Sequence, residues 1–333
     1  MRAAVMTAPG NPEVLEERQV PDPQIKAPTE LRVRLQAAGV NPVDTKLRQR
    51  GVFYPDALPA ILGCDGAGTV EAVGSAVESF QPGDAVYFCQ GGLGKPGTGN
   101  YAELAVVDER FVARKPQSLS FAQAAAAPLV LITAWEGLYD RGQLQAGQSA
   151  LVHAGAGGVG HVAIQLAKLQ GASVATTVST EEKATFVRQL GADWVIFYQQ
   201  EDFVQAARDW TAGQGVDLAF DTVGPSVLSP SLGAVRPYGN AVTLLQAGAE
   251  TDWKEARSRN LRVGFELMLT PQLQGPIEAQ RAQAQILQQC ADWIDRGRLR
   301  IRLAQTYPLS QVQAAHQLLE QGAMTGKVAL TVA

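Results

Sequence analysis

A glycine-rich segment, LVHAGAGGVG at residues 151–160, carries the chemistry that the sequence specifies most sharply. Gly155, Gly157 and Gly160 complete a G-x-G-x-x-G pattern between an apolar run and an amphipathic run, which is the strand–turn–helix setting of a dinucleotide site. We expect Gly155 to allow the sharp turn, Gly157 to let the backbone approach a pyrophosphate, and Gly160 to let the helix pack on the strand. Backbone amides at the helix start would then face the phosphates. The alternative is a glycine-rich turn that binds no ligand.

The end of the next predicted strand, at Val178, bears on which nucleotide is bound. NAD-specific sites place a carboxylate there to hold the ribose 2′-hydroxyl, whereas this sequence has Ser179 and, four residues later, Lys183. These two side chains could bind a 2′-phosphate, so we expect NADPH to be preferred over NADH. The negative charges of Glu181 and Glu182 argue against binding of a 2′-phosphate at this place. Lys183 could instead be a solvated helix residue. A capping box between Ser179 and Glu182 would give Glu182 a structural role.

The predicted strand VDLAFDTV, residues 216–223, would place more residues at the same edge of the sheet. Ligands of open α/β sheets lie beside the carboxyl ends of the strands, so we expect Val223 to contact the cofactor. Asp221 could equally be a residue that forms the turn after the strand. The other expected cofactor-binding residues in this region are Gly158, Val159 and Tyr198.

Composition narrows the class of protein. The chain has 333 residues, enough for about two domains, and its 46 % of hydrophobic residues excludes disorder as a whole. Lys and Arg total 28 against 32 for Asp and Glu, a net charge of −4, which disfavours nucleic-acid and anionic-membrane partners. We expect no membrane span and no signal peptide, because no apolar run is long enough and MRAAVMTAPGNP is typical of a first strand. Three widely spaced cysteines indicate a reducing, cytoplasmic compartment.

The pattern of apolar residues divides the chain into two domains. Up to about residue 112, short β-branched runs alternate with turn signals, as in an antiparallel barrel or sandwich. From about residue 120, continuous apolar runs alternate with helices, which predicts a doubly wound parallel sheet. The last helices and strands are too few to fold alone and are assigned to the first domain. The expected domains are residues 1–122 with 273–333, and residues 123–272.

Several elements are specific enough to be tested by the structure. Ser120 and Gln123 form a capping box that starts an Ala-rich helix, and Pro230 is expected to break a later helix. LRVGFELML, residues 261–269, is expected to be an apolar strand that needs a cover. The alternating arginines of residues 296–302 are expected on one face of a strand rather than in a nucleic-acid site.

The order of several motifs resembles the medium-chain dehydrogenase/reductase superfamily, in particular its zinc-independent quinone oxidoreductase, or zeta-crystallin-like, branch. These motifs are AAGVNPVDTKLRQRG, LPAILGCDGAGTVEAVG, GDAV, AAPLVLITAWEGL, VHAGAGGVG, GAD and FDTVG, and the similarity continues to GKVALTV. The resemblance implies an α/β fold, with a discontinuous GroES-like antiparallel β-barrel domain around a Rossmann domain. It also implies NADP(H) as cofactor, a homodimer paired through the Rossmann sheets, and Thr133 near the nicotinamide.

The sequence departs from the zinc-bearing relatives at the positions that bind metal. Those relatives carry Cys where this sequence has Asn41, His where it has Cys64, and a further Cys where it has AAAAPLVL. One remaining soft ligand does not make a catalytic zinc site, which needs about three protein ligands. Residues 91–100, where the structural zinc lobe would lie, contain no cysteine. We therefore expect no metal, and we expect Cys64 to be a small packed residue.

Without zinc, hydrogen-bond donors must stabilise the charge that develops on the acceptor oxygen. The resemblance places Asn41, Lys46 and Tyr54 near the mouth of the nicotinamide pocket. Asn41 could donate to a carbonyl or could be a turn residue before a proline, and relatives often have an aromatic residue at the position of Lys46. His153, His161 and His316 are expected to be structural.

The expected function is hydride transfer from NADPH to a small-molecule quinone or α,β-unsaturated carbonyl, because these acceptors are already polarised. The alternatives are a zinc-free alcohol dehydrogenase, an enoyl-type reductase, and a non-catalytic NADPH-binding protein with a crystallin-like or RNA-associated role. Turnover of quinones and enals would separate the enzymes from the binding protein.

Overall fold

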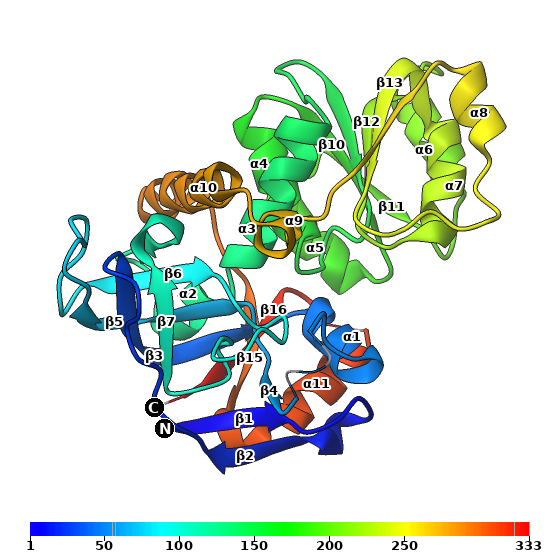
Figure 1. The fold of residues 1–333 in the computed structure, drawn as a ribbon. Helices are drawn as coiled ribbons and strands as arrows, with labels where there is room; N and C mark the ends of the chain where they lie inside the picture. The colour runs from blue at the N-terminus through cyan, green and yellow to red at the C-terminus, as the bar shows by residue number, and fades with distance from the viewer. Residues whose placement is uncertain (55, 57, 323, 333) are drawn as a thin grey trace. The chain divides into compact units, whose positions relative to one another are not determined.

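The computed structural model describes residues 1–54, 56, 58–322 and 324–332, and the chain divides into two compact units (Figure 1). Unit 1 comprises Met1–Leu129 and Leu269–Ala333, and unit 2 comprises Val130–Met268. The division therefore falls after residues 129 and 268, whereas the sequence placed it after residues 122 and 272. The first difference arises because the helix α2 (Phe121–Ala125) packs against strands of unit 1.

Unit 1 is built mainly of antiparallel strands. A seven-stranded sheet has the order β15-β16-β3-β5-β6-β8, with β7 also paired to β3, and a second sheet has the order β2-β1-β4. All pairs are antiparallel except β15 with β16. The strands are β1 (Arg2–Met6), β2 (Leu15–Gln19), β3 (Glu30–Val40), β4 (Ala60–Ile61), β5 (Asp65–Val73), β6 (Ala85–Cys89), β7 (Leu104–Asp108), β8 (Ala113–Arg114), β15 (Leu303–Pro308) and β16 (Lys327–Thr331).

The helices of unit 1 are short, apart from α10, which lies a few residues after the chain leaves unit 2. They are α1 (Pro42–Arg50), α2, α9 (Thr270–Gln274), α10 (Ile277–Asp295) and α11 (Val312–Glu320), with 3-10 turns η1 (Pro12–Val14), η3 (Glu109–Phe111) and η5 (Leu309–Gln311). The capping box expected at Ser120 and Gln123 is present at the start of α2.

Strand β3 shows how the sequence specifies this unit. Leu31, Val33 and Leu35 are buried, while the intervening Arg32 and Arg34 both pair with Glu71 on β5. This alternation is the two-residue period of a strand with one face on the core. From residue 37 to residue 40 every side chain is buried, so the end of β3 leads into the interior of the unit.

Unit 2 is a six-stranded parallel sheet with the order β11-β10-β9-β12-β13-β14. This is the 3-2-1-4-5-6 order of a doubly wound dinucleotide-binding fold, as the sequence predicted. The strands are β9 (Ser149–Val152), β10 (Ser173–Val178), β11 (Trp194–Phe197), β12 (Val216–Asp221), β13 (Val235–Thr243) and β14 (Arg262–Phe265). The helices are α3 (Pro128–Trp135), which begins in unit 1, η4 (a π-helix, Glu136–Arg141), α4 (Gly160–Leu169), α5 (Glu181–Gln189), α6 (Phe203–Trp210), α7 (Pro225–Ala234) and α8 (Trp253–Ser258).

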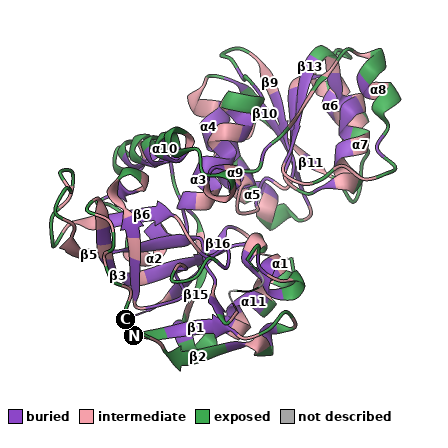
Figure 2. Ribbon diagram, in the orientation of Figure 1, coloured by how far each residue is buried: buried purple, intermediate pink, exposed green. Residues whose placement is uncertain are grey.

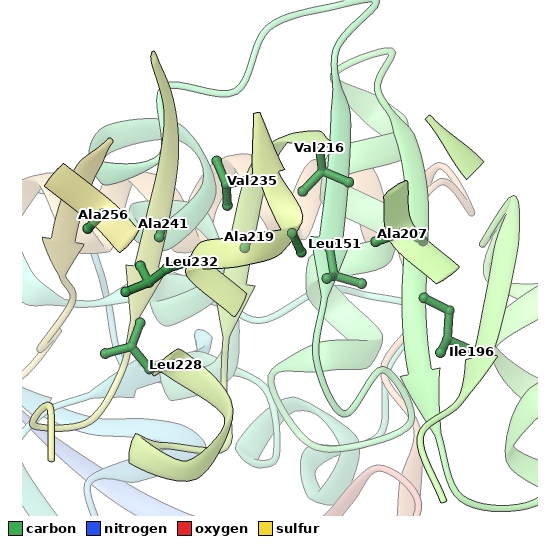
Figure 3. Packing of buried hydrophobic residues seen from close by; sticks show 12 residues of the cluster. Leu151, Ile196, Ala207, Val216, Ala219, Leu228, Leu232, Val235, Ala241 and Ala256 are labelled. Carbon is green, nitrogen blue, oxygen red and sulfur yellow. The ribbon is translucent and has the colours of Figure 1, made fainter. Parts of the chain in front are cut away.

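The inner strands β9, β10, β12 and β13 of unit 2 are largely buried, whereas the edge strands β11 and β14 and the outer helix α8 are more exposed (Figure 2). Burial on both faces explains why the strand sequences are continuous apolar runs. Figure 3 shows one part of this core, in which Leu151 and Ala219 of the sheet lie among side chains of α6 and α7, such as Leu228 and Leu232.

Two sequence predictions about individual elements, at Pro230 and at residues 296–302, were wrong, and the strand predicted at residues 261–269 is shorter than expected. Pro230 lies inside α7, which continues through it because Leu228 and Leu232 on either side are buried. Strand β14 ends at Phe265, because the next residue, Glu266, turns inward to meet Arg141. Residues 296–302 form no strand; Leu299 and Ile301 are buried in an irregular segment, and β15 begins only at residue 303.

Among the described residues, no helix is both long and apolar enough to cross a membrane.

Candidate active site

The glycine-rich segment forms the turn between β9 and α4. Its left-handed residue is Ala154 (φ 51°), so the sharp turn that we expected does not depend on a positive φ at Gly155. Gly155 is needed because a Cβ there would lie 2.0 Å from Thr176 Oγ1 on the neighbouring strand. A Cβ at Gly160 would lie 2.2 Å from the Ala154 carbonyl oxygen, which is the close approach of helix and turn that we expected.

The start of α4 presents backbone amides that have no partner within the described chain. The Gly157 amide donates to the Ala154 carbonyl at 2.8 Å, but the amides of Gly158 and Val159 make no hydrogen bond among the described residues. Such amides at a helix N-terminus bind anions, because they carry a partial positive charge and need acceptors. The turn therefore fits the pyrophosphate of a dinucleotide.

Ser179 and Lys183 lie together just beyond the tip of β10. The Lys183 ammonium donates a hydrogen bond to Ser179 Oγ at 3.3 Å, and both side chains are partly exposed. Together they offer a hydroxyl and a cation at the position where NAD-specific sites hold a carboxylate. A 2′-phosphate fits these groups.

The helix cap beside this pair differs from the one that we predicted. Thr180, not Ser179, caps α5, because its hydroxyl accepts the Lys183 amide at 3.3 Å. The capping box of Ser179 with Glu182 does not form, so Ser179 keeps its hydroxyl for other partners. Glu181 is paired with Arg188 at 2.7 Å, which offsets part of its negative charge.

The other predicted cofactor-binding residues are distributed along unit 2. Tyr198 and Val223 follow β11 and β12 and are 49 % and 44 % exposed, at the sheet edge that also carries the glycine turn. Thr133 is buried in α3. Asp221 proves to be the turn-forming residue of our alternative interpretation, because its carboxylate accepts the amides of Val223 and Gly224.

In unit 1, Asn41 is fully buried between two charged side chains. Its Nδ2 donates to Asp65 Oδ2 at 2.9 Å, and its Oδ1 accepts a hydrogen bond from the ammonium of Lys327. Lys327 also donates to the Val40 carbonyl at 3.0 Å. The Oδ1 atom and one of the two N–H groups of Nδ2 are therefore occupied inside the protein, and donation from Asn41 to a bound carbonyl stays a prediction.

A second buried group, Asp44, continues this network. Asp44 Oδ2 accepts hydrogen bonds from the backbone N–H of Asn41 at 2.8 Å and from the Tyr101 hydroxyl at 2.9 Å. Burial raises the pKa of Asp44 to about 7, because the carboxylate has lost its hydration, although these two donors lower it. The Tyr101 hydroxyl also lies 3.2 Å from His316 Nε2, and burial lowers the pKa of His316 to about 3. His316 is therefore neutral and structural, as predicted.

Sequence reasoning missed Lys327 and Tyr101 as members of this network. The available signal was a lysine at the start of an otherwise apolar run, KVALTV, that must be buried. A buried lysine needs a compensating carboxylate, so that signal would have pointed to a buried ion pair.

Lys46 and Tyr54 are the two proposed catalytic residues that reach the surface of unit 1. The Lys46 ammonium, half-buried on α1, has no hydrogen-bond or ion-pair partner among the described residues. Partial burial lowers the pKa of Lys46, and the charge of Arg50 lowers it further. Tyr54 is 37 % exposed, and the neighbouring Phe53 is held by a hydrogen bond from its amide to the Leu93 carbonyl at 3.2 Å.

The buried network does not fit a metal ion. No group of three or more His, Cys, Asp or Glu side chains in the described part of the chain is arranged to hold one. Cys64 is fully buried with its sulfur 4.0 Å from Asp44 Oδ1, and burial raises the pKa of its thiol well above the ordinary value. The ammonium of Lys327 already supplies positive charge beside Asp65, so a second cation would be repelled.

Known proteins resemble the whole chain. The alcohol dehydrogenase GroES-like domain matches residues 27–117, and the zinc-binding dehydrogenase family matches residues 190–330. A quinone oxidoreductase of Pseudomonas aeruginosa is 35 % identical over 321 residues, which cover 96 % of each chain. The chloroplastic NADPH-dependent alkenal/one oxidoreductase of Arabidopsis thaliana is 34 % identical, covering 98 % of this chain and 78 % of that protein.

Solved structures agree with these sequence relatives. The structure of Escherichia coli quinone oxidoreductase complexed with NADPH matches with a TM-score of 0.86 and 31 % identity, over 100 % of both chains. The glycine turn, the strand order of unit 2 and these full-length similarities together show that the chain belongs to the medium-chain dehydrogenase/reductase superfamily, in its quinone oxidoreductase branch.

Proposed function

We propose that this protein transfers a hydride from NADPH to a quinone or an α,β-unsaturated carbonyl. The observation that carries the proposal is the contact between Lys183 and Ser179 at the tip of β10, on the same sheet edge as the glycine turn. A hydroxyl and an ammonium there suit a nucleotide with a 2′-phosphate. The quinone and alkenal reductases among its relatives support the class of acceptor.

Residues of unit 2 would hold the cofactor. The amides of Gly158 and Val159 would bind the pyrophosphate, Ser179 and Lys183 the 2′-phosphate, and Tyr198 would lie beside the nucleotide. Val223 and Thr133 are proposed to line the nicotinamide end. When bound, NADPH supplies the hydride, and the protein orients it and excludes water.

Lys46 and Tyr54 are proposed to stabilise the oxygen of the acceptor. The ammonium and the phenol can each donate a hydrogen bond as negative charge develops on that oxygen. The Lys46 ammonium has no partner among the described residues, so it is available for this role. Asn41 is also proposed to be a positioning residue, because its side chain joins the start of α1 to Asp65 and Lys327.

A metal-free site favours acceptors that are already electron-poor. The donors of unit 1 are hydrogen-bonding groups, which polarise a carbonyl less strongly than a metal ion does. Quinones and enones carry conjugated carbonyls and accept hydride at a carbon or oxygen that needs little further activation. We therefore propose that simple ketones and alcohols are poor substrates.

The decisive experiment is an acceptor screen with purified protein, following NADPH oxidation by the nicotinamide absorbance. We expect turnover of benzoquinone, naphthoquinone, an enal and an enone, and little oxidation of simple alcohols with NADP⁺. Oxidation of alcohols without reduction of any quinone, enal or enone would contradict the proposal. Tight NADPH binding without turnover of any acceptor would favour the non-catalytic alternative.

We also propose that two copies of the chain pair along β14 in the cytoplasm. This strand is the edge of the parallel sheet, and Phe265 and Leu267 at its end are 54 % and 53 % exposed. An uncovered apolar edge promotes association, so a second copy would cover it.

The proposed cytoplasmic location is supported by the three cysteines, which are free and buried and so fit a reducing compartment.

A further inference from the structure

A cavity of about 390 Å³ lies within unit 1, in the range of volumes that hold small molecules. One wall is Phe88 of β6 with residues 105–107 of β7, and another is the loop of residues 91–99. Ile277, the first residue of α10, closes a third side. Tyr54, one of the proposed catalytic residues, also lines this cavity.

Most polar side chains of the cavity wall are already bonded within the protein. Arg110 donates to both oxygens of Asp108, at 2.8 and 2.7 Å. The Thr98 hydroxyl donates to a backbone carbonyl of its own loop at 2.8 Å, and the Glu30 carboxylate accepts two backbone amides. Gln272 bonds through both ends of its amide to the backbone at the end of β6 and just beyond it. These particular groups have little capacity left to recognise a ligand, so polar recognition in the cavity would fall to Lys95 and to Asn100 Oδ1, which is buried without a partner among the described residues.

The wall also has an apolar part, although Gln90, Lys95, Asn100 and Gln280 line the cavity as well. Phe88, Leu93 and Val107 are buried, and Ile277 leaves 45 % of its surface exposed at the start of α10. The loop of residues 91–100 takes part in the core of this unit, because Leu93 is buried and forms a β-bridge with Leu62. Binding of an apolar ligand here is favoured, because the ligand displaces water from apolar surface of the cavity wall.

We infer that this cavity binds the uncharged hydrocarbon tail of the acceptor. The acceptor would then be a quinone with an alkyl or isoprenoid tail, or a long-chain 2-alkenal, with its carbonyl beside Tyr54. The inference rests on the proposed function, because it requires that the carbonyl be reduced at Tyr54. It adds that the acceptor extends away from the reacting carbonyl along β7.

The first test measures kcat/KM for a homologous series of alkylbenzoquinones, from methyl to decyl. Each methylene that enters an apolar site is expected to raise kcat/KM about two- to fourfold until the cavity is full. A wild-type protein whose kcat/KM does not change along the series would overturn the inference, while leaving the reductase function intact. Failure to reduce any member, short or long, would instead count against the proposed function.

Two variants localise the effect. Ile277→Asp places a charge at the cavity wall and is compatible with the helix start, where acidic residues are favoured. Val106→Trp, on a half-buried wall position of β7, would fill the cavity with a bulky side chain. Each variant is expected to lower the ratio of decyl to methyl kcat/KM at least tenfold.

The chain offers a matched control in Trp253→Asp. Trp253 is also the first residue of a helix and is 44 % exposed, but it lies in unit 2 and outside the cavity. This control is expected to keep the wild-type ratio. An equal fall of the ratio in all three variants, or in none of them, would show that the tail binds elsewhere.

A binding measurement without turnover completes the test. Decanol is expected to raise the Tm of the wild-type protein and of Trp253→Asp, but not that of Ile277→Asp or Val106→Trp. Equal stabilisation of all four proteins by decanol would overturn the assignment of the cavity.

Discussion

The ammonium of Lys327 donates a hydrogen bond to the side-chain oxygen of Asn41, although 286 positions separate the two residues in the chain. This contact joins the start of β16 to the residue that precedes α1. Asn41 passes the connection on to Asp65 through its Nδ2 atom. The segment that carries Lys46 is therefore anchored at its base by a buried cation and a buried anion.

We expect Lys327→Met to destabilise the protein by about 3–5 kcal/mol, measured by urea unfolding. The cause is the Asp65 carboxylate, which would remain buried without a compensating charge. Adding Asp65→Asn should recover part of this lost stability. The double variant should therefore lose less unfolding free energy than the sum of the losses of the two single variants. A loss below about 1 kcal/mol for Lys327→Met would mean that the two charges do not depend on each other.

The pH dependence of stability should report on Asp44. Its pKa of about 7 in the folded protein lies above its ordinary value of 3.8, so the folded state retains a proton that the unfolded chain releases. This stabilising contribution is complete below about pH 4 and is lost as the pH rises towards 7. Asp44→Asn should flatten unfolding free energy against pH in that window, because its amide stays uncharged while its oxygen still accepts hydrogen bonds.

Asp108→Asn is the control for that experiment. Side-chain hydrogen bonds from Arg110 and Thr29 outweigh the effect of burial and hold the pKa of Asp108 below its ordinary value. Its contribution to stability is therefore lost as the pH falls, at more acid pH than the window of Asp44. A flatter profile between pH 4 and 7 in Asp108→Asn, or an unchanged profile in Asp44→Asn, would contradict our assignment.

Lys183→Ala should weaken NADPH binding by about five- to thirtyfold, because it removes a charge-assisted hydrogen bond to the 2′-phosphate. The affinity for NADH should change by less than about twofold, since NADH lacks that phosphate. Fluorescence titration gives both dissociation constants. Lys254→Ala, at an exposed lysine of the same unit, is the charge-matched control and should leave both unchanged. Equal losses of both nucleotides in Lys183→Ala would count against a 2′-phosphate contact.

Phe265→Asp should convert the proposed dimer to a monomer, measured by light scattering after size-exclusion chromatography. A charge at the end of β14 would have to be buried if the two edges remained paired. Tyr238→Asp, at a residue of the same unit that is 70 % exposed, is the control and should keep the wild-type mass. A monomeric wild-type protein at micromolar concentration would refute the pairing itself.

The alternation of strands and helices along unit 2 could be predicted from the sequence, because each strand is an apolar run flanked by turn and helix signals. The reason for Gly155 could not, since the obstructing atom belongs to Thr176 on another strand and becomes a neighbour only after folding. Asn41 shows the same limit. Its type and its place before a proline suggested either a donor or a turn residue, whereas its role depends on Lys327, which only the tertiary fold brings near. Pro230 shows how packing can override a local signal.

The pairing of β16 with β3 also determines when unit 1 can be completed. While the chain is being synthesised, residues 130–268 emerge as one uninterrupted block and can fold before β16 exists. The sheet of unit 1 must wait until residues 327–331 arrive, with the buried cation among them. Loss of this one strand would therefore remove both a pairing partner of β3 and the counter-charge of Asp65. Unit 2 would then be folded while the sheet of unit 1 stayed incomplete.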